Sequence, residues 1–253
     1  MPPLLPGGVR NASPPPMKRK LAWWIFALAV CACLVTLAHS FVFSLVEVSG
    51  DGFQPTLLRG DRIYVNRWSY GLRAPFSDHQ GYKRWFPRKV HRGEWLAFNT
   101  PATEPSEQPD TTALCLGMIM AQPADTVWMG RGAHVSPVRR YAHGQIWPLV
   151  VPSKGAYLKI HPWDAELYAQ MLRQHEGVEA TVRTDSLYIN GKYQEFCRFS
   201  QDYYWVSSQN DSNLLDSRTF GFVPERCIMG RMEMVVYSLD GLRPRWKRSF
   251  KPL

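Results

Sequence analysis

The chain has 253 residues, of which 30 are Lys or Arg and 21 are Asp or Glu, so its formal net charge at pH 7 is +9. Hydrophobic residues make up 45% of the chain and aromatic residues 13%, which excludes a wholly disordered protein. The length allows one large β domain or two small ones. The cysteines form no Cys-x-x-Cys pair and show no Cys/His metal spacing, so we expect no metal and no other cofactor.

The positive charge is concentrated in three runs, at residues 18–20, 83–92 and 243–251. Aromatic residues such as Trp85, Phe86 and Trp246 lie within the last two runs. Cations mixed with aromatic rings are typical of a membrane interface, and no helix-turn-helix or RNA-binding signature accompanies them. We therefore expect a lipid bilayer, and not nucleic acid, as the partner of these runs.

The N-terminal segment predicts a membrane anchor. Residues 1–20 form a proline-rich tail that ends in a basic flank, and we expect this tail to be disordered. Residues 21–46 contain no Asp, Glu, Lys or Arg, which predicts a transmembrane helix because about 20 apolar residues cross a bilayer. The basic flank places the N-terminus in the cytoplasm and the rest of the chain on the outer, periplasmic side of the inner membrane. A signal peptide cleaved near Ala38 is the alternative, which the apolar residues beyond that point disfavour.

The remaining pattern is mainly that of strands, with one helix. Residues 61–66 alternate polar and apolar side chains, as a half-buried strand does, and residues 94–98, 125–129, 155–160 and 232–237 predict further strands. Asn190-Gly191 between two strand-forming runs predicts a hairpin with a type I′ turn. A helix is expected over about 162–177, where Gly177 can end it. We thus expect a mainly β, antiparallel domain over 47–240 with one inserted helix, followed by a basic tail over 241–253.

Three segments, in this order, resemble the motifs of type I signal peptidases. These are membrane-bound serine endopeptidases that remove signal peptides from exported preproteins. Residues 48–58, VSGDGFQPTLL, followed by Gly60-Asp61, match the first motif, and residues 122–127, QPADTV, are similar to the Leu-Pro-Gly-Asp motif. Residues 216–225, DSRTFGFVPE, resemble the last motif. The resemblance implies a signal-peptidase-like β domain behind a single transmembrane helix.

The resemblance also locates the family's Ser/Lys dyad, in which a desolvated neutral lysine takes the proton of the serine hydroxyl. Counting back from Pro55 places Gly52 at the nucleophile position, and counting back from Pro123 places Gly117 at the general-base position. Leu214 replaces the serine that orients the lysine. Because loss of a nucleophilic serine alone costs on the order of a million-fold in turnover, the resemblance implies a catalytically degenerate member.

The other motif positions match the family. We expect these positions to have structural roles, with an ion pair between Asp216 and Arg218; they are Asp61, Pro123, Asp125, Asp216, Ser217 and Arg218. By the resemblance, Phe53, Gln54 and Pro55 line a groove that takes an extended signal peptide by strand addition. Phe53 replaces the methionine that is usual in the family.

Three hypotheses about function follow. The first is a protein that binds signal peptides without cleaving them. The second is an active endopeptidase with a divergent site, for which Ser49 is a weak candidate nucleophile and Cys115 or a histidine triad are further options. The third is a non-catalytic partner of an active signal peptidase paralogue. In the oxidising compartment that this topology implies, Cys197 and Cys227 either form a disulfide or remain buried thiols.

Overall fold

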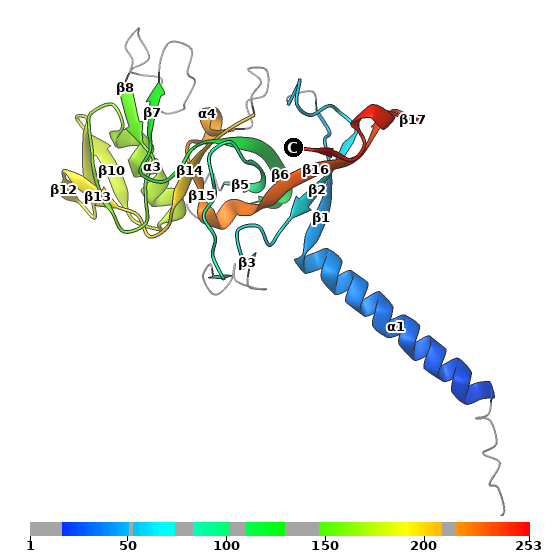
Figure 1. Cartoon of the computed structure of the whole chain (residues 1–253). Helices are drawn as coiled ribbons and strands as arrows, with labels where there is room; N and C mark the ends of the chain where they lie inside the picture. The colour runs from blue at the N-terminus through cyan, green and yellow to red at the C-terminus, as the bar shows by residue number, and fades with distance from the viewer. Residues whose placement is uncertain (1–16, 51–52, 74–82, 102–109, 130–146, 209–215) are drawn as a thin grey trace, which may run out of the picture. The chain divides into compact units, whose positions relative to one another are not determined.

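The structure is a computed structural model of the whole chain, and it describes residues 17–50, 53–73, 83–101, 110–129, 147–208 and 216–253 (Figure 1). The predicted tail 1–16 lies outside the described residues, as do Gly52 and Leu214. The chain divides into two units, residues Met1–Phe41 and Val42–Leu253.

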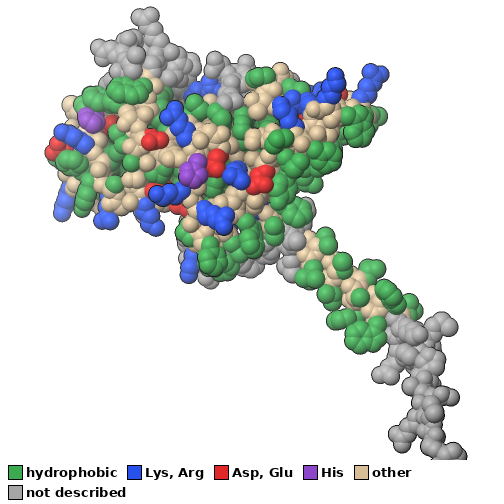
Figure 2. All heavy atoms as spheres, in the orientation of Figure 1, with side chains coloured by type: hydrophobic (Ala, Val, Ile, Leu, Met, Phe, Trp, Pro, Cys, Tyr) green, Lys and Arg blue, Asp and Glu red, His purple; other side chains and the backbone are tan. Residues whose placement is uncertain are grey.

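The first unit contains the helix α1 (Met17–Phe41). Hydrophobic side chains cover its visible surface in the space-filling view (Figure 2), and Trp23 and Trp24 are 71% and 75% exposed. No helix among the residues described here combines the length and the apolar character needed to cross a membrane. The helix ends at Phe41, and the outer part of the predicted span 21–46 forms strand β1 (Phe43–Glu47), because its backbone pairs with β2.

The second unit is built on one large antiparallel sheet with the strand order β1-β2-β16-β5-β6-β14-β15 (Figure 1). The other strands of this order are β2 (Asp61–Asn66), β16 (Ile228–Asp240), β5 (Trp95–Thr100), β6 (Asp110–Ala121), β14 (Tyr203–Ser207) and β15 (Val223–Pro224). The C-terminal segment predicted as a basic tail folds back on β16 through β17 (Arg243–Pro244), the short helix η3 (Trp246–Arg248) and β18 (Lys251–Pro252).

Smaller sheets and the inserted helix flank the large sheet. The strands of the smaller sheets are β3 (Leu72–Arg73), β4 (Arg84–Trp85), β7 (Thr126–Met129), β8 (Trp147–Val150), β9 (Tyr157–Lys159), β10 (Ala180–Arg183), β11 (Ser186–Ile189), β12 (Lys192–Gln194) and β13 (Phe196–Arg198). The helices are α3 (Ala165–His175), α4 (Ser217–Phe220) and η2 (Glu225–Cys227). The predicted mainly β, antiparallel domain is therefore confirmed; it contains the expected helix as α3 and a further short helix, α4, that was not predicted.

The strands, the turn and the helix predicted from the sequence agree with the observed elements apart from some of their ends. All five predicted strands are present, although β5 begins at Trp95 and β16 is longer than the predicted 232–237. Asn190 and Gly191 have φ angles of 50° and 74°, which are those of the predicted type I′ turn. The helix predicted over 162–177 is α3, which is shorter at both ends, and Gly177 follows it with φ 65°.

Cys197 and Cys227, for which the sequence left a disulfide and buried thiols as alternatives, are both thiols. Cys197 packs with α3 in one hydrophobic cluster, whereas Cys227 packs with Phe98 and Val206 in another. Burial raises the pKa of the Cys197 thiol to about 12. Both residues therefore act as small buried side chains.

His175, at the end of α3, is a buried titratable group. Burial, together with the positive charge of Arg226, lowers the pKa of His175 to about 3. The Arg226 Nη2 atom lies 3.3 Å from Nδ1 of the imidazole. The folded domain therefore holds this ring neutral.

Replacing His175 by Gln should change how stability depends on pH. In the unfolded chain His175 takes up a proton near pH 6.5, whereas in the folded chain it does so only near pH 3. The unfolded state thus binds more protons between these values, and the free energy of unfolding falls as the pH is lowered, by up to about 1.4 kcal/mol per pH unit. Urea unfolding of both chains from pH 7 to pH 4 should show the stability advantage of the wild type shrinking. A difference that is constant with pH would contradict this assignment.

The turn between β6 and β7 contains a strained residue. Ala124 has φ 70°, in the left-handed region, at the position where the family motif has glycine. Asp125 stabilises the turn, because its Oδ2 atom accepts a hydrogen bond of 2.8 Å from the Gln122 N–H. The Ala124 N–H donates to the Val151 carbonyl oxygen at 2.9 Å, which fixes the backbone in this conformation.

Ala124→Gly should therefore raise the free energy of unfolding, by roughly 0.5–1 kcal/mol, because glycine adopts a positive φ without the Cβ penalty. Ala156→Gly is the matched control: Ala156 is also exposed but has no positive φ. The control should be destabilising by about 0.5–1 kcal/mol, since it only adds backbone freedom to the unfolded chain. Urea unfolding of the two variants should give opposite signs, and equal signs would refute the argument.

Candidate functional site

Gly117, which the sequence predicts at the general-base position, lies in the interior of the large sheet. Gly117 is a buried residue of β6, where it pairs with Leu96 of β5 on one side and faces β14 on the other. A Cβ atom on Gly117 would overlap Cγ1 of Val206 and would lie 3.2 Å from the Ser207 carbonyl oxygen. The position therefore holds neither a titratable group nor the space for one.

Ser217, in the last motif, positions the Val206 side chain that fills this space. The Val206 N–H donates a hydrogen bond of 2.9 Å to the Ser217 hydroxyl oxygen. Both residues are fully buried. This contact fixes the start of α4 against β14, so a residue of the family motif holds the strand that packs against Gly117.

Asp216 and Arg218 form the predicted ion pair. The Arg218 Nη2 and Nε atoms donate to the Asp216 carboxylate at 2.8 and 3.0 Å, and Asp216 also caps α4 by accepting from the Arg218 N–H. Ser208, at the end of β14, donates to the same carboxylate from its N–H and its hydroxyl, at 2.9 and 3.1 Å. A fully buried carboxylate with this many donors is well compensated, and it joins α4 to β14.

The first motif forms a turn before β2. Phe53 is only 9% exposed and packs with Leu57 in a hydrophobic cluster, whereas Gln54 and Pro55 lie on the surface. The Gln54–Pro55 peptide bond is cis. Of the three residues expected to line the groove, only Gln54 and Pro55 thus present their side chains outward.

Asp61 anchors this turn from its buried position at the start of β2. Its Oδ2 atom accepts from the Leu58 N–H at 3.0 Å and from Arg248 Nη2 at 2.7 Å, and the same Arg248 nitrogen donates to the Thr56 carbonyl oxygen at 2.9 Å. Burial raises the pKa of Asp61, but the hydrogen bonds from Arg248 and Leu58 outweigh this effect, so the pKa lies below its ordinary value. The charged Asp61 therefore fixes the turn together with the C-terminal segment.

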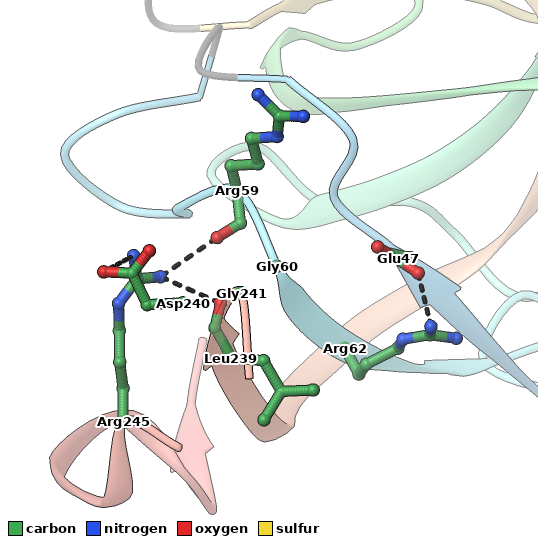
Figure 3. A pocket seen from close by; sticks show the side chains of 8 residues that line it. All are labelled: Glu47, Arg59, Gly60, Arg62, Leu239, Asp240, Gly241 and Arg245. Carbon is green, nitrogen blue, oxygen red and sulfur yellow. Dashed lines mark hydrogen bonds and ion pairs between the residues drawn. The ribbon is translucent and has the colours of Figure 1, made fainter. Parts of the chain in front are cut away.

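A pocket of about 440 Å³ lies beside this turn, and Figure 3 shows the residues that line it. Two ion pairs occupy its walls, Arg62 with Glu47 and Arg245 with Asp240. Arg245 also donates to the carbonyl oxygen of Arg59, at 3.0 Å, which ties the turn to the end of β16. The walls are polar and charged, so the pocket does not suit the small apolar side chains that precede a signal-peptide cleavage point.

Ser49, Cys115 and the histidines are the alternative catalytic residues that the sequence offered. Ser49 is exposed, and no hydrogen bond joins its hydroxyl to a lysine or histidine in the part of the chain that the structure describes. Cys115 is buried, and its Sγ atom lies 3.4 Å from the Thr100 hydroxyl oxygen. His161 pairs with Asp164 at the start of α3. His79, His134 and His143 lie outside the described residues, and His91 is exposed.

Two residues of this region were missed by the sequence analysis. Val206 matters through its position across from Gly117, and Arg248 matters through its contact with Asp61. The sequence offers a signal for neither, because both contacts join segments that are far apart in the chain. The sequence analysis assigned the cation-rich C-terminus to a lipid surface, whereas Arg248 within it pairs with the buried carboxylate of Asp61.

Comparisons with known proteins agree with the motifs. The profile of the family described as signal peptidase, peptidase S26, matches residues 21–237. Signal peptidase I of Aquifex aeolicus is 25% identical over 239 residues, which covers 85% of this chain and 83% of that protein. Signal peptidase I P of Bacillus subtilis subsp. natto is 23% identical over 227 residues, with coverages of 89% and 94%. The chain therefore belongs to the signal peptidase family, peptidase S26.

Proposed function

We propose that this protein is a catalytically degenerate signal peptidase that binds signal peptides of exported preproteins without cleaving them. The observation that carries the proposal is Gly117: the position of the general base is buried and is filled by Val206 from the neighbouring strand. Removing only the base leaves a serine without activation, and Gly52 removes the serine as well. The residual rate enhancement of such a site is about a thousandfold over water, too little to process preproteins.

The peptide-binding part of the proposal rests on features that survive next to the emptied site. Among the described residues, β1 pairs with a strand on one side only, so its outer edge can take an extended peptide by strand addition. Gln54 and Pro55 are exposed on the turn that follows β1. Asp61 and Arg248 hold this turn in one conformation, which lowers the entropic cost of binding.

We further propose that the N-terminal helix anchors the protein in the inner membrane, with the β domain on the outer side. Residues 21–46 carry no ionisable Asp, Glu, Lys or Arg side chain, and the basic residues 18–20 precede them. The large apolar side chains of α1 are exposed along the helix. This topology would bring the β domain to the membrane face at which signal peptides emerge.

Site-specific photocrosslinking tests the binding function. A photoreactive amino acid at Gln54 should crosslink to the signal peptide of a labelled preprotein, whereas the same group at Gln194, an exposed residue on β12, should not. The full-length chain in lipid is used, and the preprotein should remain uncleaved. Absence of crosslinks from position 54 would refute signal-peptide binding, and crosslinks to a second signal peptidase alone would favour a role as its partner.

The same reaction mixture distinguishes an active peptidase from a protein that binds signal peptides without cleaving them. A correctly cut preprotein that disappears with Ser49→Ala would contradict the degenerate site and identify a rebuilt nucleophile. A cut product that Ser49→Ala leaves unchanged would point to Cys115 or to a histidine, and Cys115→Ala would then be compared with the wild type. Absence of product over many hours is the expected result.

The closed general-base position also makes a prediction about stability. Gly117→Ala should lower the free energy of unfolding by about 1–3 kcal/mol, because the added methyl group overlaps Val206. In a Val206→Ala background the same substitution should cost much less, since the overlapping Cγ1 atom is gone. Urea unfolding of the wild type, both single variants and the double variant measures this coupling. An equal cost in both backgrounds would mean that Val206 does not fill the position.

A further inference from the structure

The loop at residues 83–92, which we call the aromatic loop, presents two aromatic side chains on the surface of the β domain. Trp85 is 43% exposed and Phe86 is 85% exposed. Phe86 also has φ 52°, a left-handed conformation that is unfavourable for a bulky residue. A strained backbone that holds an apolar ring in solvent indicates a surface kept for contact with another apolar phase.

The aromatic loop is firmly attached to the β domain. Its strand β4 pairs with β3, the Arg84 Nη2 atom donates to the Ile228 carbonyl oxygen at 2.6 Å, and the Arg88 N–H donates to the Tyr70 carbonyl oxygen at 3.1 Å. Gly71 permits this close approach: a Cβ atom there would lie 2.6 Å from the carbonyl oxygens of both Trp85 and Phe86. The exposed rings are thus held in place before any partner binds, which lowers the entropic cost of docking.

A pocket of about 330 Å³ lies next to the aromatic loop and carries a surplus of positive charge. Trp68, Arg88, Lys89 and His91 line it together with Arg231 and Glu94. The carboxylate in the pocket is already used, because Glu94 accepts from Arg231 at 3.2 Å, from the Tyr70 hydroxyl at 3.0 Å and from the His91 N–H at 2.9 Å.

Arg88 and Lys89 supply the charge that this carboxylate does not neutralise. Both are exposed, and neither has a carboxylate partner among the described residues. Figure 2 shows hydrophobic and cationic side chains next to one another at the lower end of the β domain, where Figure 1 places β3. The loop thus combines a pocket of net positive charge with exposed aromatic rings. The positive charges of Arg88 and Lys89 would neutralise an anion bound in this pocket.

We propose that the aromatic loop docks on an anionic phospholipid surface, with the Trp85 and Phe86 rings among the lipids and a headgroup phosphate in the cationic pocket. The pocket lies where the chain enters the β domain: Phe43 pairs with Asn66, a lining residue, and the Arg67 N–H donates to the Val42 carbonyl oxygen at 3.0 Å. Because Val42 and Phe43 directly follow the helix in the sequence, this region is close along the chain to the segment proposed as the anchor. A soluble phosphate would satisfy Arg88 and Lys89 but would leave the aromatic rings in water.

The test uses the full-length chain reconstituted in vesicles of phosphatidylcholine, with or without phosphatidylglycerol. An environment-sensitive fluorescent amino acid replaces Phe86, and Tyr193, which is 59% exposed on β12, is the control position. Bromine-labelled lipid should quench the probe at 86 and leave the probe at 193 unchanged, and phosphatidylglycerol should increase the quenching. Equal signals at both positions, or no effect of phosphatidylglycerol, would overturn the proposal.

Charge variants distinguish binding of a headgroup in the pocket from general electrostatic attraction between the domain and the lipid surface. With the probe at 86, Arg88→Gln/Lys89→Gln should lower the docking equilibrium constant by a factor of about five per charge, roughly 25-fold in all. The matched control Arg183→Gln/Lys192→Gln removes the same charge from exposed positions on β10 and β12 and should have little effect. Equal losses in the two variants would mean that the pocket has no specific role.

Two further arms identify the source of the signal. Inorganic phosphate added to phosphatidylcholine vesicles should leave the probe at 86 unchanged. A spectral shift of the probe without quenching by lipid would instead identify free phosphate, and not a lipid headgroup, as the ligand of the pocket. The inference rests on the proposed membrane anchor, which flotation of the vesicles measures separately. A chain that fails to float contradicts the anchor, whereas a chain that floats with an unquenched probe at 86 contradicts only the docking.

Discussion

The close approach of β6 and β14 at Gly117 is the constraint on which the packing of this region depends. Only a residue without a Cβ atom lets Val206 occupy the space between these strands. Ser217 holds the Val206 backbone, and Asp216 with Arg218 holds the end of β14, so the last family motif fixes the strand that fills the position. Residues of the last motif thus support a packing that leaves no room for a side chain at position 117.

Asp61 and Asp216 give two motif positions a structural role that does not depend on catalysis. Each is a fully buried carboxylate paired with an arginine that is itself largely buried, and each also accepts backbone N–H groups of a turn. Removing either partner would leave a buried charge without compensation, which is far more costly than losing a surface ion pair. These positions are thus constrained by the fold, whether or not the site reacts.

Local signals in the sequence predicted much of this fold, and non-local contacts account for what was missed. Asn190-Gly191 specifies its turn from two residues, and the pairing of Asp216 with Arg218 spans one short helix. Val206 meets Gly117 across a strand pair, so no pattern in either segment reveals the overlap. The end of α1 at Phe41 was likewise hidden, because residues 43–47 are apolar enough to extend the helix and become a strand only by pairing with β2.

The contact between Arg248 and Asp61 sets an order for assembly. The two residues are 187 positions apart, and Arg248 lies near the end of the chain. At a synthesis rate of about 5–20 residues per second, roughly 10–40 s pass between the appearance of Asp61 and that of its partner. During this interval the turn at residues 53–58 lacks the contact with Arg248, so it reaches its final form only after the segment that carries Arg248 has emerged.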